Sequence, residues 1–255
     1  IHMIYKKINM APDVAQLQNM MLAFRSLVFP DCFPYDGPQA VEILGQQLSR
    51  VMGEEKAHGL CDSFASELSE ISRLLHTDVE AVAQNDPAAS CHEEIILCYP
   101  AVKVMMHYRV AHALHKLGVP VIPRVLTELA HSETGIDIHP AATIGEYFSI
   151  DHGTGIVIGA TSVIGNHVML YQGVTLGAKN FRYSPDGSPM DIPRHPILED
   201  NVTVYSNTSI LGRVRIGHDT VVGGNVWLTR DVPPHSRILQ TSALLQPLYE
   251  DGSGI

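Results

Sequence analysis

The sequence predicts an α+β protein in which an N-terminal α-helical domain is followed by a parallel β-helix. In the first half of the chain, apolar residues recur at the three- and four-residue spacing of helices. Further on, an aliphatic residue returns at every sixth position, a period that fits one short strand and one turn. Three such units make one triangular coil. The aliphatic positions fall in three registers: Ile138, Ile144, Ile150 and Ile156; Ile158, Ile164, Leu170 and Leu176; and Leu198, Val204, Ile210, Ile216, Val222 and Leu228.

The α-helical domain is expected to cover residues 3–135. Apolar stripes predict helices over residues 12–29, 41–52, 60–75, 100–117 and 121–132. Residues 77–80 have the pattern of a capping box, which predicts that a separate short helix begins at Thr77. That helix should end near Asp86, because Pro87 disfavours a helical conformation in the residue before it.

The β-helix is expected to cover residues 136–235, since the period changes near Gly135 and the repeat stops after residues 232–234. Residues 178–197 leave the repeat and are rich in turn-forming Ser, Pro, Asp and Gly. Because a solenoid accommodates insertions as outward loops, this segment predicts a projecting loop. Residues 236–255 are expected to form a flexible C-terminal tail.

Composition excludes several classes of function. A formal net charge of −10 argues against nucleic-acid binding driven by electrostatics. No apolar run has the length of a membrane helix and no signal peptide is visible, so we expect a cytoplasmic protein. The four cysteines form no C-x-x-C pair, so the spacing of a zinc site is absent and we expect no metal.

Residues suited to chemistry gather in segments 137–140, 150–155 and 193–196. Less than one coil separates Asp137 from His152, so the two could lie on neighbouring edges of successive layers. A carboxylate beside an imidazole fixes its tautomer and stabilises its charged form, as a general base requires. Arg194 offers a planar fork for a substrate carboxylate. From the residues alone, His152 is explained equally well as a corner residue where the repeat slips by two positions.

The same segments resemble bacterial serine O-acetyltransferases. The resemblance rests on Asp-Ile-His-Pro-Ala-Ala at 137–142, Ile-Asp-His-Gly-Thr-Gly-Ile-Val-Ile-Gly at 150–159, Gln-Gly-Val-Thr-Leu-Gly at 172–177 and Arg-His-Pro at 194–196. Asn-Asp-Pro-Ala at 85–88 is similar to a motif of the family's helical domain. Three departures are Ala160, where the family usually has glutamate, the longer inserted loop with a proline before Arg194, and Ile-Leu-Gln-Thr-Ser-Ala at 238–243, where the family usually has Gly-Val-Pro-Ala.

The resemblance implies a left-handed β-helix and an acyltransferase that moves acetyl from acetyl-CoA, its co-substrate, to the hydroxyl of L-serine. The product would be O-acetylserine, a precursor in cysteine biosynthesis. By this resemblance, His152 is the general base and Asp137 orients it. The remaining residues implied are Asp86, Asp151, Arg194 and His195 for the ammonium and carboxylate of serine, and Ala178, Ser206 and Gly224 for coenzyme A.

The resemblance also implies partners. Family members form trimers with the active site between subunits, and trimers pair into hexamers. L-Cysteine differs from serine by one atom and is expected to act as a feedback inhibitor at the same site. In the family, a C-terminal isoleucine, here Ile255, enters the active site of cysteine synthase.

Three other functions stay open at the level of sequence. One is acetyl transfer to a sugar or another hydroxyl acceptor. A second is a non-catalytic scaffold that binds cysteine synthase. A third is a metal-dependent hydratase on the same fold, which would need three converging histidines, such as His152, His195 and His167.

Overall fold

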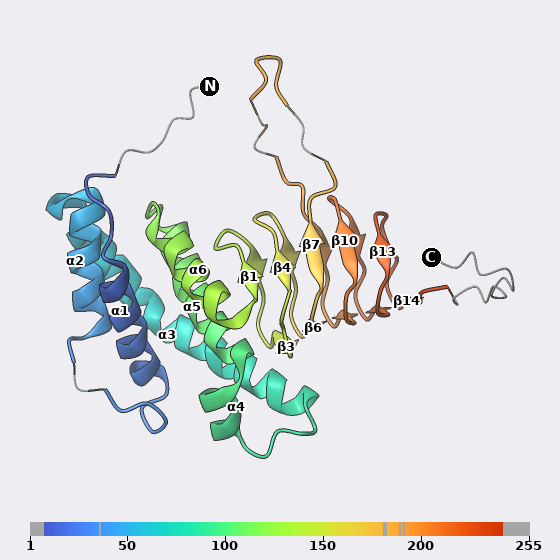
Figure 1. The fold of residues 1–255 in the computed structure, drawn as a ribbon, viewed down its shortest axis with the longest axis horizontal. Coiled ribbons are helices and arrows are strands. Elements are labelled where there is room, and N and C mark those ends of the chain that lie inside the picture. Colours follow the sequence, from blue (N-terminus) through green and yellow to red (C-terminus); the bar gives the residue numbers. More distant parts are fainter. Residues whose placement is uncertain (1–7, 36, 181–182, 189, 191, 242–255) are drawn as a thin grey trace, which may run out of the picture.

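Helices lie at one end of the molecule and a β-helix at the other (Figure 1). The structure is a computed structural model, and it describes residues 8–35, 37–180, 183–188, 190 and 192–241. It confirms the predicted fold, an α-helical domain followed by a left-handed parallel β-helix with a projecting loop. Within the described residues, no helix combines the length and the apolar character needed to cross a membrane.

The helices follow local signals in the sequence. They are α1 (Val14–Val28), α2 (Ala40–Met52), α3 (Glu54–Asn85), α4 (His92–Cys98), α5 (Pro100–Lys116) and α6 (Ile122–Thr134). Asp13 caps α1, because its carboxylate accepts hydrogen bonds from the first backbone amides of the helix. Pro100 begins α5, where its missing N–H costs nothing. Gly135 ends α6 in the left-handed conformation, with φ 71°.

The prediction that a separate helix begins at Thr77 is wrong. α3 runs through this position without a break. The Thr77 hydroxyl donates to the carbonyl of Leu74, 2.7 Å away in the preceding turn, instead of capping a new helix. The predicted end of the helix before Asp86 is confirmed. The short helix α4 was not predicted.

The strands of the β-helix form three parallel sheets, and each of the first four coils contributes one strand to each sheet, while the fifth adds strands to sheets A and C and an isolated bridge at Val232 to sheet B. Sheet A contains β1 (Asp137–Ile138), β4 (Val157–Ile158), β7 (Thr175–Gly177), β10 (Ser209–Leu211) and β13 (Trp227–Leu228). Sheet B contains β2 (Thr143–Ile144), β5 (Val163–Ile164), β8 (Ile197–Leu198) and β11 (Arg215–Ile216). Sheet C contains β3 (Ser149–Asp151), β6 (Met169–Tyr171), β9 (Thr203–Val204), β12 (Val221–Val222) and β14 (Arg237–Ile238).

The registers stack the six-residue repeat into aliphatic columns. In sheet A, Ile138 lies opposite Ile158, which in turn lies opposite Leu176. The chain turns from sheet A to B at the A–B corner, from B to C at the B–C corner, and from C to A at the C–A corner. The projecting loop leaves the A–B corner between β7 and β8 (Figure 1). The repeat continues further than predicted, because β14 still pairs with β12.

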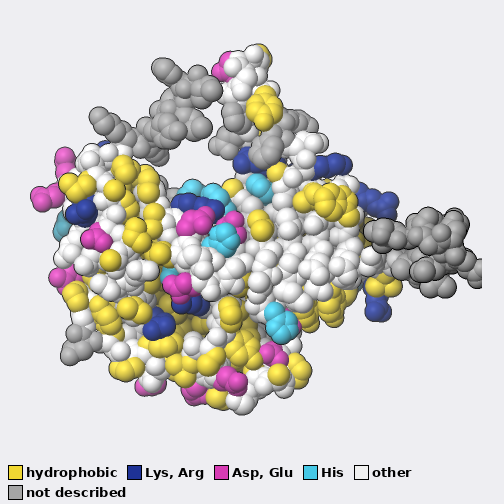
Figure 2. Space-filling view, in the orientation of Figure 1, with side chains coloured by type: hydrophobic (Ala, Val, Ile, Leu, Met, Phe, Trp, Pro, Cys, Tyr) yellow, Lys and Arg dark blue, Asp and Glu magenta, His cyan; other side chains and the backbone are white. Residues whose placement is uncertain are grey.

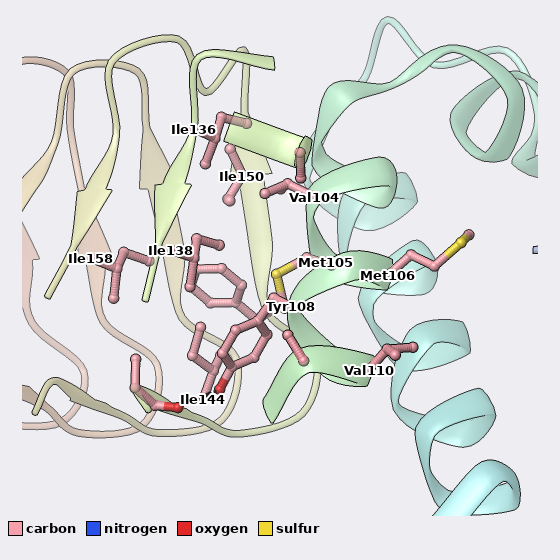
Figure 3. Close-up of a cluster of buried hydrophobic side chains, with 14 of the residues drawn as sticks. Val104, Met105, Met106, Tyr108, Val110, Ile136, Ile138, Ile144, Ile150 and Ile158 are labelled. Carbon is pink, nitrogen blue, oxygen red and sulfur yellow. Dashed lines mark hydrogen bonds between the residues drawn. The ribbon is translucent and has the colours of Figure 1, made fainter. Parts of the chain in front are cut away.

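The helical domain covers the first coil of the β-helix. Figure 3 shows Met105 and Tyr108 of α5 beside Ile138 and Ile144, which lie in the first coil. The buried Tyr108 hydroxyl also donates to the backbone carbonyl of Ala142 over 2.6 Å. This packing seals the end of the aliphatic column that would otherwise face water.

A buried ion pair ties two helices to the same coil. Arg109 of α5 bonds the carboxylate of Asp78 in α3, with N–O distances of 2.9 and 3.1 Å. Its guanidinium also donates to the carbonyls of Ile144 and Gly145 over 2.7 and 2.6 Å. Asp78 in turn accepts the backbone N–H of Phe148. Burial raises the pKa of Asp78, and the facing Arg109 opposes that effect.

Candidate active site

His152 lies in a widened turn at the C–A corner of the first coil. The corner spans residues 152–156, and the same corner of the next coil is shorter. Its backbone is left-handed at His152 (φ 55°), Gly153 (φ 89°) and Gly155 (φ 80°). A side chain at Gly153 would collide with Ile136, since a Cβ there would lie 2.4 Å from Ile136 Cδ1. The turn therefore aims the His152 side chain outward, and it is 73% exposed.

Two carboxylates lie near His152 on this corner, and one of them is bonded to a tyrosine. His152 Nε2 lies 3.8 Å from Asp151 Oδ1. Asp86, just beyond the end of α3, accepts a 2.6 Å hydrogen bond from the Tyr99 hydroxyl. A small pocket is lined by Asp86, Tyr99 and Asp151 together. We call these four residues the C–A group.

Hydrogen bonding keeps Asp86 ionised. The Tyr99 hydroxyl, the backbone N–H of Ala88 and the charge of His152 hold the pKa of Asp86 below its usual range. The same contact with Asp86 raises the pKa of Tyr99 to about 12, so its phenol keeps its proton. The C–A group thus presents anionic oxygens beside an imidazole, which suits an ammonium group and an adjacent proton transfer.

A second set of polar residues lies at the A–B corner and the adjoining edge of sheet A. Arg194 and His195 lie just before β8, separated from it by Pro196, and the charges of Arg194 and His139 both act on His195. Asp137, in β1, acts on His139 together with Arg194. Figure 2 shows basic, acidic and histidine side chains gathered where the helical domain meets the β-helix. We call Asp137, His139, Arg194 and His195 the A–B group.

His195 is anchored tightly within the A–B group. Its Nδ1 lies 2.8 Å from the Thr161 hydroxyl and accepts the Thr161 backbone N–H at 3.1 Å. Its ring fills the space above Gly159, where a Cβ would lie 2.0 Å from His195 Cδ2. Burial, with the nearby Arg194, lowers the pKa of His195 to about 4. His195 is therefore a neutral hydrogen-bonding group near pH 7.

The structure does not join the predicted pair Asp137 and His152 within this chain. Asp137 Oδ1 accepts a hydrogen bond from Arg124 at 3.3 Å. The carboxylate beside His152 is instead that of Asp151. The residues predicted to bind coenzyme A also lie at two different corners. Ser206 and Gly224 lie on adjacent coils of the C–A corner, and Ala178 lies at the A–B corner.

Sequence reasoning missed two tyrosines of the C–A corner. Tyr99 precedes Pro100 at the start of α5, so it looked like an ordinary helix boundary. Tyr171 ends β6 and stacks on Tyr205 with ring centroids 4.7 Å apart, and the charges of Asp151 and Asp86 help to raise its pKa. A signal was present, since Tyr171 and Tyr205 each follow an inward aliphatic residue of the repeat.

The three histidines that a hydratase would need lie on three different corners. His152 is at the C–A corner, His195 at the A–B corner and His167 at the B–C corner. These three described residues therefore do not converge within the chain, and the structure gives no support to a hydratase centre built from them in one subunit.

Curated relatives point to one enzyme class. The chain is 48% identical to a plasmid-borne serine acetyltransferase of Synechococcus elongatus over 79% of this chain and 63% of that protein. It is 40% identical to the serine acetyltransferase of Helicobacter pylori over 66% of this chain and 94% of that protein. The match thus spans less than two thirds of the first relative's length and nearly all of the second. No family model matches the chain.

Solved structures agree with this similarity. The structure is similar to serine acetyltransferase isoform 3 of Entamoeba histolytica, solved in complex with cysteine, with a TM-score of 0.79 and 33% identity. That match covers 91% of this chain and 84% of the other. The likeness therefore includes the helical domain as well as the β-helix.

Proposed function

Because the chain belongs to the serine acetyltransferase family, we propose that it transfers acetyl from acetyl-CoA to the hydroxyl of L-serine, forming O-acetylserine. The observation that carries this proposal is the C–A group, in which the exposed imidazole of His152 lies beside the carboxylates of Asp151 and Asp86. Serine offers an ammonium group for the carboxylates and a hydroxyl for the imidazole. We also propose a cytoplasmic location.

The proposed chemistry needs one base. His152 takes the proton from the serine hydroxyl as its oxygen attacks the thioester carbonyl, since an alkyl hydroxyl is a weak nucleophile otherwise. The C–S bond then breaks, and the proton held by His152 passes to the departing thiolate. Asp86 and Asp151 hold the ammonium, while Arg194 binds the carboxylate through its planar fork. Neutral His195, whose Nδ1 accepts from Thr161, donates a hydrogen bond from Nε2.

We propose that a second copy of the chain completes the site. The C–A group lies at one edge of sheet A and Arg194 and His195 lie at the other, with Asp137 in β1 between them, so the candidate residues are spread across this face. The outward face of sheet A also carries Val157, 39% exposed, and Trp227, 72% exposed. Packing these faces around a three-fold axis would cover the apolar side chains and bring the A–B group of one copy to the C–A group of the next.

In this homotrimer, Asp137 of a second copy would orient His152. Coenzyme A would lie between the copies, with Ser206 and Gly224 on one side and Ala178 on the other. The mass of the protein in solution, measured by light scattering, tests this arrangement and separates a trimer from a dimer of trimers. A monomer that is fully active at the same concentration would contradict the shared site.

The activity test follows free thiol released from acetyl-CoA by the purified protein. We expect release that depends on L-serine, with O-acetylserine identified by mass spectrometry. Sugars and other hydroxyl compounds form the comparison arm. Thiol release with a sugar but not with serine would replace the proposed acceptor. Serine-independent hydrolysis alone would reject acetyl transfer.

L-Cysteine is proposed as a competitive inhibitor, because it presents the same ammonium and carboxylate as serine. The Entamoeba relative solved with cysteine supports this. The same assay at several serine concentrations measures it. Binding of cysteine synthase through Ile255 remains a proposal as well, and that residue lies outside the described part of the chain. A pull-down with full-length and shortened chains tests it.

Replacing Tyr99 by Phe tests how the serine ammonium is held. Loss of the Tyr99 hydroxyl removes the hydrogen bond that lowers the pKa of Asp86. The pKa of Asp86 is therefore expected to rise. We expect kcat/KM for serine to fall several-fold and the acidic limb of its pH profile to move to higher pH. Tyr183→Phe, on the projecting loop and 62% exposed, is the matched control. An unchanged acidic limb in Tyr99→Phe would remove Tyr99 from this role.

A further inference from the structure

A cluster of two histidines and a carboxylate lies at the B–C corner, the corner that neither the C–A group nor the A–B group uses. His218 Nδ1 and Asp219 Oδ2 are 2.7 Å apart. His235 Nδ1, from the following coil, lies 3.6 Å from the same oxygen. The two imidazole rings meet edge to face, with centroids 4.8 Å apart and an interplanar angle of 87°. Two ring nitrogens thus lie within 4 Å of one carboxylate oxygen.

The backbone fixes this geometry. The amide of His235 donates to the carbonyl of His218 over 2.9 Å, which joins the two coils at the corner. Asp219 and His235 are both left-handed, with φ 55° and 57°. Asn201, one coil earlier, donates its side-chain amide to Asp219 Oδ1 at 3.0 Å. Asn201 therefore occupies one carboxylate oxygen and leaves the other facing the histidines.

These separations fit a metal ion. In a tetrahedral zinc site with bond lengths near 2.0–2.2 Å, neighbouring ligand atoms lie roughly 3.3 Å apart. The N–O distances of 2.7 and 3.6 Å lie on either side of that value. All three ligand atoms lie within 4.8 Å of one another, so side-chain rotations would bring them to the separations of such a site. All three side chains reach solvent, at 46%, 41% and 71% exposure, so an ion has a direct path of entry.

Another cluster of similar composition is less suited to a cation. Glu128, His131 and Asp137 also bring ligand atoms together. However, the guanidinium of Arg124 already bonds both Glu128 and Asp137 there. A cation would have to displace that positive charge. At the B–C corner, the groups that lower the pKa of Asp219 are His218, Asn201 and His235, and the guanidinium of Arg215 in β11 is paired with Glu199 at 2.7 Å.

We propose that His218, Asp219 and His235 form a binding site for a divalent transition metal, with Zn²⁺ the best match to two imidazoles and one carboxylate. Water would complete the coordination. The ion would link the turn of one coil to the turn that leads into β14, the final described strand. It would therefore cross-link the last two coils, at the end of the β-helix farthest from the helical domain. The proposal is independent of the proposed acetyl transfer.

The test uses the tag-free full chain, stripped of metal by a chelator and titrated with ZnCl₂ by calorimetry. We expect one Zn²⁺ per chain and a higher thermal midpoint when zinc is present. His218→Ala and His235→Asn should each weaken binding at least about tenfold, and Asn keeps the left-handed backbone at position 235. Asn201→Ala, which frees the second carboxylate oxygen, should weaken binding roughly 10–100-fold.

A matched control separates this site from ordinary surface histidines. His92 Nε2 lies 3.0 Å from a carboxylate oxygen of Glu80, and no second histidine joins this pair in the cation-site clusters of the described chain. His92→Ala should leave zinc affinity unchanged. Circular dichroism checks that each variant is folded. Equal zinc affinity in wild type, His218→Ala and His235→Asn would overturn the proposal, as would the absence of binding at millimolar zinc.

Discussion

Replacing His152 by Asn is expected to lower kcat for serine acetylation by about 10²–10⁴-fold, the range that a general base contributes. The side chain lies at the C–A corner beside Asp151 and is largely exposed, so its replacement removes little buried surface. Asn is the better replacement because His152 has φ 55°, a conformation that Asn adopts more readily than Ala. The effect should therefore be on turnover and not on folding.

The matched control is His167→Asn. His167 has nearly the same backbone conformation, with φ 54°, but lies at the B–C corner and stacks on Tyr147. Its replacement should leave kcat near that of wild type. Initial rates of thiol release, measured at saturating serine and acetyl-CoA, decide the question. Comparable turnover in both variants would mean that another group, or water, takes the proton.

Replacing Arg109 by Met is expected to destabilise the protein by about 3–5 kcal/mol, because it leaves the carboxylate of Asp78 buried without its partner. Both side chains are almost fully buried, at 4% and 3% exposure. The carbonyls of Ile144 and Gly145 also lose a donor. We expect the thermal midpoint to fall on the order of 10 °C.

The double variant Asp78→Asn with Arg109→Met should recover part of this loss, since no buried charge then remains. Arg73→Met is the matched control, because Arg73 bonds Glu70 and Glu146 at the exposed surface. It should barely move the midpoint. Thermal unfolding followed by circular dichroism measures all three. A midpoint as high in Arg109→Met as in Arg73→Met would show that the buried pair does not stabilise the fold.

The six-residue repeat predicted the β-helix well, because every inward position is set by local periodicity. Ile138, Ile158 and Leu176 stack in sheet A as their spacing requires. The error at Thr77 has the opposite origin. A capping box is a local signal, but the neighbouring Asp78 is held by Arg109 of another helix. No pattern within α3 carries that information. The contact with Arg109 therefore outweighed the local capping signal, and the helix continues.

The candidate site was predictable residue by residue but not as an arrangement. The motifs identified His152, Asp151 and Asp86, which the structure brings to one corner. They could not show that Arg194 lies across sheet A from them, or that the Asp137 carboxylate bonds Arg124 instead of His152, since both depend on the tertiary arrangement. The role of Tyr99 depends on a contact between α5 and the end of α3, which sequence spacing does not encode.

Met105 and Tyr108 cover the first coil of the β-helix, and this packing determines where local unfolding begins. Each coil bonds only to the coils before and after it, so the β-helix behaves as a one-dimensional stack. The first coil of this stack packs on the helical domain, whereas the last described coil contacts another coil on one side alone. Fraying should therefore begin at the far end and progress inward coil by coil. The coil that holds His152 lies against the helical domain, where local opening is rarest.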